Sequence, residues 1–197
     1  LTRLPSITSL RSLRAFASAS SAINPFTGFG DPVLKGGADV KKGFEIIDLF
    51  RGNQGNVESI RAMSELPDTS KELQTIAKFL NVSEDNLYLR ERATETNVKS
   101  IDLSSFRVIS FATHGLIAGE ITGLAEPALV LTPPEKGSIE DDGLLTASEI
   151  TQLNLNADWI LLSACNTAAG ETLEAEGLSG LARAFIYAGA HSMLVSH

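Results

Sequence analysis

The sequence of 197 residues contains one cysteine, Cys165. A lone cysteine can form neither an intramolecular disulfide nor, by itself, a structural zinc site, so the fold needs no oxidising compartment. The chain also lacks any apolar run near the roughly 20 residues that a membrane-spanning helix requires. Positive charge is scarce, and the net charge of -8 argues against a phosphate backbone as a partner. We therefore expect a soluble, cytoplasmic protein that binds neither membranes nor nucleic acids.

Residues 1–30 contain no Asp or Glu, and the first acidic residue of the chain is Asp31. This composition, with three arginines and six serines, can mark a mitochondrial presequence. Because this N-terminal segment continues directly into the predicted domain, we interpret it as a linker instead. A chain of this length suits one domain. We predict a linker or peripheral segment at residues 1–25 and a domain at residues 26–197.

Two strongly apolar runs dominate the second half of the chain. Residues 106–115, FRVISFATHG, and residues 157–170, ADWILLSACNTAAG, both place large apolar residues before small and polar ones. This pattern is typical of a buried parallel strand that opens into a loop. The first run leads to His114 and the second to Cys165. If the strands are parallel neighbours, both side chains emerge at the carboxyl edge of the sheet, where catalytic groups collect.

A cysteine and a histidine that meet there can act as nucleophile and base. A free thiol has a pKa of about 8.5, and an imidazole beside it can take its proton or stabilise the thiolate. Taken singly, a cysteine such as Cys165 is more often a small buried apolar residue, and a histidine such as His114 more often hydrogen-bonds a nearby carbonyl. The two matching strand ends favour the catalytic pair.

The sequence around both residues resembles a known family. Four segments carry the resemblance: FATHG at 111–115, DGLLTA at 142–147, LSACNT at 162–167 and EGLSGLARAF at 176–185. They are similar to the CHAT domain, a caspase-like module often found behind tetratricopeptide repeats in bacteria. The separation of 51 residues between His114 and Cys165 also matches the roughly 50 residues of the caspase signature. The resemblance is dense from about residue 104 onward and loose before it.

The resemblance implies both an architecture and a chemistry. The expected fold is α/β, a caspase-like three-layer α/β/α sandwich with a mostly parallel sheet and a small antiparallel flap. The implied activity is that of a cysteine endopeptidase, in which Cys165 attacks the scissile carbonyl and His114 serves as general acid and base, with no cofactor and no metal. The backbone N–H groups of Gly115 and Cys165 would hold the oxyanion. Asp31, in a Gly-Asp-Pro that closes the first core strand in the family, would lie at the same edge and contact a basic substrate side chain.

The resemblance also bears on partners and on alternatives. It implies a protein or peptide substrate, tetratricopeptide repeats in a longer protein, and a domain truncated at its C-terminal end. A catalytically silent interaction or signalling module with this fold is the alternative function, and a turn-forming Asp before Pro is the alternative for Asp31. A nucleotide-binding domain would rest on Gly28 and Gly30, yet no clear strand precedes them and no helix start follows.

The remaining pattern predicts the supporting elements. We expect a helix from about residue 70 to 80, a short strand at 86–89, a weaker helix within 91–102, and an edge strand at 127–134 to which residues 143–145 return antiparallel. Thr146 and Glu149 have the spacing of a capping box that starts a helix at 147 to about 153. Residues 33–62 and 166–176 are predicted as loops, and a helix from about 178 ends near Gly189.

Overall fold

The structure is a computed structural model that describes residues 21–35, 53–121, 123–138, 140–163 and 171–196. Its centre is a five-stranded sheet with the order β2-β1-β3-β7-β8. The strands are β1 Asn24–Pro32, β2 Leu87–Arg90, β3 Phe106–Ala112, β7 Trp159–Ser163 and β8 Met193–Ser196. All neighbouring pairs are parallel, so the carboxyl ends of the five strands lie at one edge.

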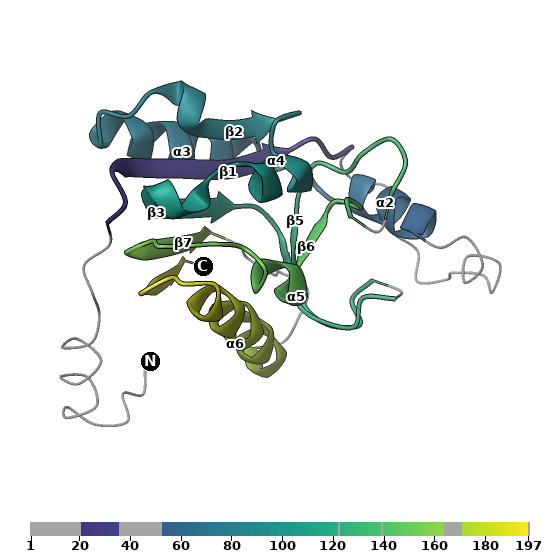
Figure 1. The fold of residues 1–197 in the computed structure, drawn as a ribbon. Coiled ribbons are helices and arrows are strands. Elements are labelled where there is room, and N and C mark those ends of the chain that lie inside the picture. Colours follow the sequence, from purple (N-terminus) through teal and green to yellow (C-terminus); the bar gives the residue numbers. More distant parts are fainter. Residues whose placement is uncertain (1–20, 36–52, 122, 139, 164–170, 197) are drawn as a thin grey trace, which may run out of the picture.

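Helices cover both faces of this sheet (Figure 1). They are α3 Pro67–Phe79 on one face, and α4 Glu95–Ser100, α5 Ala147–Ile150 and α6 Glu171–Tyr187 on the other. Successive strand side chains alternate between the faces. Phe26 packs with Leu73 of α3, whereas Phe29 belongs to the core cluster that contains Phe185 of α6. The predicted three-layer α/β sandwich with a mostly parallel sheet is confirmed.

A row of aromatic rings ties the central strands to α6. The ring of Phe29 stacks on Tyr88 at a centroid distance of 4.9 Å and on Phe111 at 5.2 Å. Phe111 in turn contacts Phe185 of α6 at 5.4 Å. These rings come from β2, β1, β3 and α6, so large apolar contacts hold the neighbouring strands in register.

A second sheet stands beside the first. It consists of β4 Gly115–Leu116, β5 Ala128–Val130 and β6 Leu144–Thr146, antiparallel and in the order β4-β5-β6. We call it the small sheet. Helix α2, Asn53–Arg61, packs on it through Ile60, which shares a core cluster with Leu116 and Leu144. The antiparallel return is confirmed, but the prediction of β5 as an edge strand is wrong. The prolines at 133 and 134 lie beyond the strand and leave its ladder intact.

Other parts of the chain also differ from the sequence prediction. Helix α3 begins at Pro67, not near residue 70, because proline is well tolerated in the first turn of a helix. Within the predicted loop 33–62, α2 went unrecognised since its sequence, NQGNVESIR, has only two large apolar residues, Val57 and Ile60. Helix α6 begins at Glu171, although residues up to 176 were expected in a loop. The remainder of both loops, at 36–52 and 166–170, and residues 1–20 lie outside the described residues.

The Gly-x-Gly of β1 has a packing explanation. A Cβ on Gly28 would lie 2.9 Å from the Leu73 side chain, and one on Gly30 would lie 2.7 Å from it. Both glycines therefore allow α3 to approach the sheet closely. Two 3₁₀ helices, Glu84–Asn86 and Leu103–Ser105, lead into β2 and β3.

Candidate active site

Strands β3 and β7, which lead toward the two predicted catalytic residues, are neighbours in the sheet. They pair in parallel, and their last residues, Ala112 and Ser163, are register partners. His114 follows β3 by two residues, and in the sequence Cys165 follows β7 by two residues. Cys165 itself lies outside the described residues. The predicted adjacency of the two strand ends is confirmed.

The imidazole of His114 is held by a backbone carbonyl. Its Nε2 lies 2.8 Å from the carbonyl oxygen of Ser64, in the segment between α2 and α3. Because a carbonyl only accepts hydrogen bonds, Nε2 must carry the proton. In the neutral imidazole this leaves Nδ1 as the proton acceptor. The Ser64 carbonyl thus orients the half-buried His114 and makes Nδ1 its basic nitrogen.

Strand β5 holds the backbone on both sides of the imidazole. The N–H of Val130 donates to the His114 carbonyl at 2.9 Å, and the hydroxyl of the buried Thr113 donates to the Val130 carbonyl. This pattern makes Gly115 and Leu129 a pair that exchanges no hydrogen bonds. The N–H of Gly115 is therefore turned away from β5, as a donor to a bound ligand would have to be.

Asp31 lies at the carboxyl end of β1, as the resemblance implied. Its backbone has a φ of 48°, in the left-handed region, and its N–H donates to the hydroxyl of Thr69 at 2.9 Å. The carboxylate is buried and accepts a hydrogen bond from Arg90 at 3.3 Å. A cation of the protein itself already neutralises this carboxylate, so a basic substrate side chain would have to compete with Arg90.

Two further carboxylates near the sheet were not found from the sequence. One is Glu72 of α3, whose Oε2 accepts a hydrogen bond from the Ser163 hydroxyl at 3.1 Å. Both side chains are partly open to solvent beside the end of β7. In the sequence Glu72 looks like any exposed helical glutamate, so no local signal could have shown this contact.

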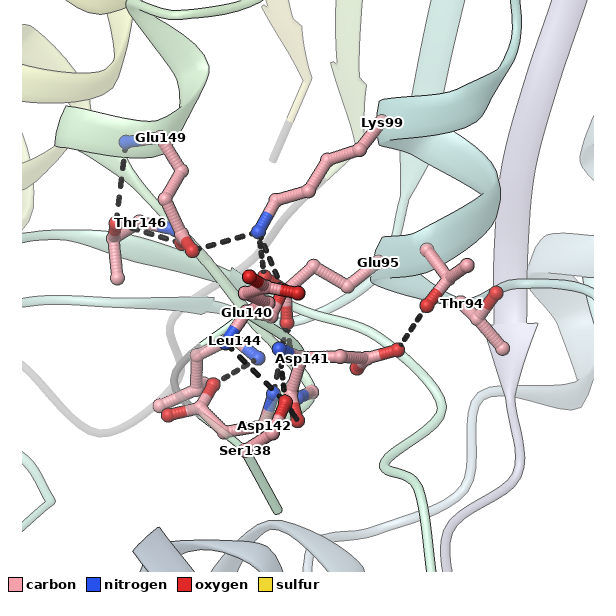
Figure 2. Close-up of polar contacts among 12 residues, drawn as sticks. Thr94, Glu95, Lys99, Ser138, Glu140, Asp141, Asp142, Leu144, Thr146 and Glu149 are labelled. Carbon is pink, nitrogen blue, oxygen red and sulfur yellow. Dashed lines mark hydrogen bonds and ion pairs between the residues drawn. The ribbon is translucent and has the colours of Figure 1, made fainter.

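The other is Glu95, the first residue of α4, whose side chain is only 1% exposed. Its Oε2 accepts from the N–H groups of Asp142 at 3.0 Å and Gly143 at 3.2 Å, immediately before β6. Its Oε1 pairs with Lys99, which also contacts Glu149 of α5 at 2.8 Å (Figure 2). We call Glu95, Lys99 and Glu149 the charged cluster. Three separate segments contribute to the cluster and its contacts, which explains why sequence spacing did not reveal it.

Burial and the contacts between charged groups act in opposite directions on the pKa values of the charged cluster. Loss of water raises the pKa of Glu95 to about 8, although Lys99 opposes the rise. Burial also acts to raise the pKa of Glu149, but hydrogen bonds from Lys99 and Thr146 outweigh it and lower that pKa. For Lys99 burial acts to lower the pKa, and the contacts with Glu149 and Glu95 reverse this and raise it. The predicted capping box of Thr146 and Glu149 is confirmed, so Glu149 serves both α5 and the cluster.

The chain matches one family throughout its length. The family model of the CHAT domain covers residues 1–197. The chain belongs to the CHAT domain family. This family is related to caspase-like cysteine peptidases, and CHAT domains often accompany tetratricopeptide repeats in longer proteins. Curated proteins and solved structures give no match to the chain.

Two properties of the described part of this CHAT domain concern other classes of site. No helix there is long and apolar enough to cross a membrane. Among the same residues, no group of three or more His, Cys, Asp and Glu side chains is arranged to hold a metal ion.

Proposed function

We propose that this CHAT domain is a cysteine endopeptidase, with Cys165 as the nucleophile and His114 as the general acid and base. The observation that carries the proposal is the register of β3 and β7. Ala112 lies opposite Ser163, and each candidate residue follows its strand by two positions. The protonated Nε2 of His114, bonded to Ser64, supports it because Nδ1 is then free to accept the thiol proton.

The chemistry proceeds through an acyl-enzyme. Nδ1 of His114 takes the proton from the Cys165 thiol, and the sulfur forms a bond to the scissile carbonyl carbon. The carbon–nitrogen bond then breaks, and the imidazolium gives its proton to the leaving amine. In the second half, His114 takes a proton from water, the hydroxide attacks the thioester, and the sulfur leaves and is reprotonated.

Backbone donors would stabilise the charge on the substrate oxygen. The N–H of Gly115, turned away from β5, and the N–H of Cys165 are the proposed oxyanion donors. Loss of one such donor costs about 3 to 4 kcal/mol where it has been measured in other enzymes. Asp31 is the proposed contact for a basic side chain before the scissile bond, in competition with Arg90.

The substrate is proposed to be a protein or a peptide, and the domain is proposed to work in a longer protein with tetratricopeptide repeats. The test is to profile that longer protein against a peptide library beside its Cys165→Ala variant. We expect cleavage by the wild type and none by Cys165→Ala, with the same thermal melting curve for both. Ser163→Ala is the matched control near the strand end and should cleave. Undiminished cleavage by Cys165→Ala would exclude the proposal, and no cleavage by any form would favour a silent interaction module.

A further inference from the structure

The small sheet connects the candidate active site to a buried carboxylate that the proposed reaction does not use. The N–H of Val130 in β5 donates to the His114 carbonyl at 2.9 Å. The next residue, Leu131, donates its N–H to the carbonyl of Gly143 at 2.8 Å. Gly143 in turn donates its own N–H to Glu95 at 3.2 Å. Three hydrogen bonds, linked by short stretches of backbone, thus lead from Glu95 to His114.

We infer that Glu95 is a positioning residue, which holds the small sheet where Gly115 and His114 need it. This inference rests on the proposed peptidase function. Glu95 touches neither candidate catalytic residue and acts through the backbone of β6 and β5. Its carboxylate accepts both N–H groups at the start of β6, which would otherwise be left without an acceptor near the interior.

The surroundings of Glu95 are those of a buried structural carboxylate, not those of a solvated residue at the start of a helix. The side chain is 1% exposed, whereas a carboxylate at the first turn of a helix is ordinarily in water. Lys99 of the same helix, Glu149 of α5, and Glu140, Asp141 and Asp142 of the preceding loop are the charged groups around it (Figure 2). Lys99 also donates to the Glu140 carbonyl at 2.7 Å, and Thr96 bonds to Asp141. The loop before β6 is therefore fastened to α4 at several points, with Glu95 the most buried of them.

Gly143, whose N–H donates to Glu95, is closely packed. Gly143 has a φ of 88°, and a Cβ there would lie 2.8 Å from Cβ of Pro133. The segment that follows β5 is held as well, because the N–H of Thr132 donates to the Ala93 carbonyl at 2.8 Å. Residues 93 and 95 thus hold the segment that follows β5 and the segment that precedes β6, the two strands of the hairpin that supports His114.

The test compares Glu95→Gln with Asp158→Asn in the longer protein, at a pH above the value of about 8 to which burial raises the pKa of Glu95, where the wild-type side chain is ionised. The glutamine side chain would direct an amide nitrogen at the Lys99 ammonium or at the two backbone N–H groups, so these contacts weaken. Asp158 pairs with Arg107 at the opposite, amino edge of the sheet and is the matched loss of a paired carboxylate. We expect Glu95→Gln to lower kcat about tenfold with KM changed less than about twofold, because removal of an oxyanion donor outright costs about a hundredfold or more. Asp158→Asn should leave both constants unchanged.

Hydrogen exchange supplies a readout that does not depend on activity. Peptides covering 113–116 and 128–131 should exchange faster in Glu95→Gln, while peptides from β1 and β3 stay as protected as in the wild type. Unchanged exchange and kcat, or equal losses in Asp158→Asn, would overturn the inference. If Cys165→Ala retains cleavage, the peptidase proposal fails and the exchange result still decides the role of Glu95. Should Glu95→Gln not fold, Glu95→Asp, which keeps the charge but shortens the reach, must show the same pattern at smaller size.

Discussion

The two sheets of this CHAT domain are held together by different forces. The five-stranded sheet is fixed by apolar contacts, among them the stacked rings of Phe29 and Phe111 and the tilted contact of Phe111 with Phe185. The small sheet has only short strands, and a buried charged cluster fastens the loop before β6. The comparison teaches that apolar packing holds the platform for the candidate site, whereas the hairpin that supports His114 combines its own apolar cluster with a buried carboxylate. Each substitution below changes a residue that supports one of the two sheets.

The largest effect is expected from the aromatic row of the main sheet. Phe111→Ala removes a fully buried ring that contacts Phe29 and Phe185. The resulting cavity should lower the free energy of unfolding by about 3 to 5 kcal/mol. Urea denaturation measures it, with Phe79→Ala as the control because Phe79 is 92% exposed. A loss below about 1 kcal/mol for Phe111→Ala, or an equal loss for Phe79→Ala, would contradict the assignment of the main sheet to apolar packing.

The next effect is a change in how the free energy of unfolding depends on pH, through Glu95 beside the small sheet. Burial raises the pKa of Glu95 from 4.5 to about 8 in the folded protein. Between these values the unfolded chain has released the proton that the folded chain keeps, so this group's contribution to stability falls as pH rises. Glu95→Gln cannot titrate and should remove this part of the slope. Asp142, whose pKa burial also raises, and Glu149, whose pKa is lowered, remain in both proteins.

Urea denaturation from about pH 5 to about pH 8.5 measures the two slopes. The wild type should lose more stability than Glu95→Gln as pH rises across this interval. Parallel stability curves for the two proteins would show that the buried carboxylate does not retain its proton.

The smallest effect is expected at the start of α5. Thr146→Ala removes the hydroxyl that accepts the Glu149 N–H and so breaks the capping box. The loss should be about 1 kcal/mol in the free energy of unfolding. Thr151→Ala is the control, because the Thr151 hydroxyl donates to the Ser148 carbonyl and takes no part in the capping box. Equal losses in the two variants would mean that the cap adds nothing particular to this junction.

The main sheet could be predicted from the sequence to the extent that its strands are apolar. The runs that end before His114 and Cys165 indicated β3 and β7 with the correct direction. β1 was expected only through the resemblance, since Gly28, Gly30 and Asp31 interrupt its apolar pattern. The helical residues before Gly177 were missed because glycines normally weaken helices.

The charged cluster could not be predicted for a different reason. Glu95, Lys99 and Glu149 come from two helices, and the amides they serve lie in a loop between strands. Each residue alone has the appearance of an exposed helical charge. Only the folded arrangement removes Glu95 from water, so the sequence contains no periodic or spaced signal for it.

The most direct test of the central claim is the rate at which a peptide chloromethyl ketone alkylates Cys165 in the longer protein. The account predicts that His114→Ala slows alkylation by about a hundredfold or more, since the imidazole no longer takes the thiol proton. His191→Ala, which changes a histidine near Asp158 at the other edge, should react like the wild type. Equal alkylation rates in all three proteins would contradict the pairing of Cys165 with His114.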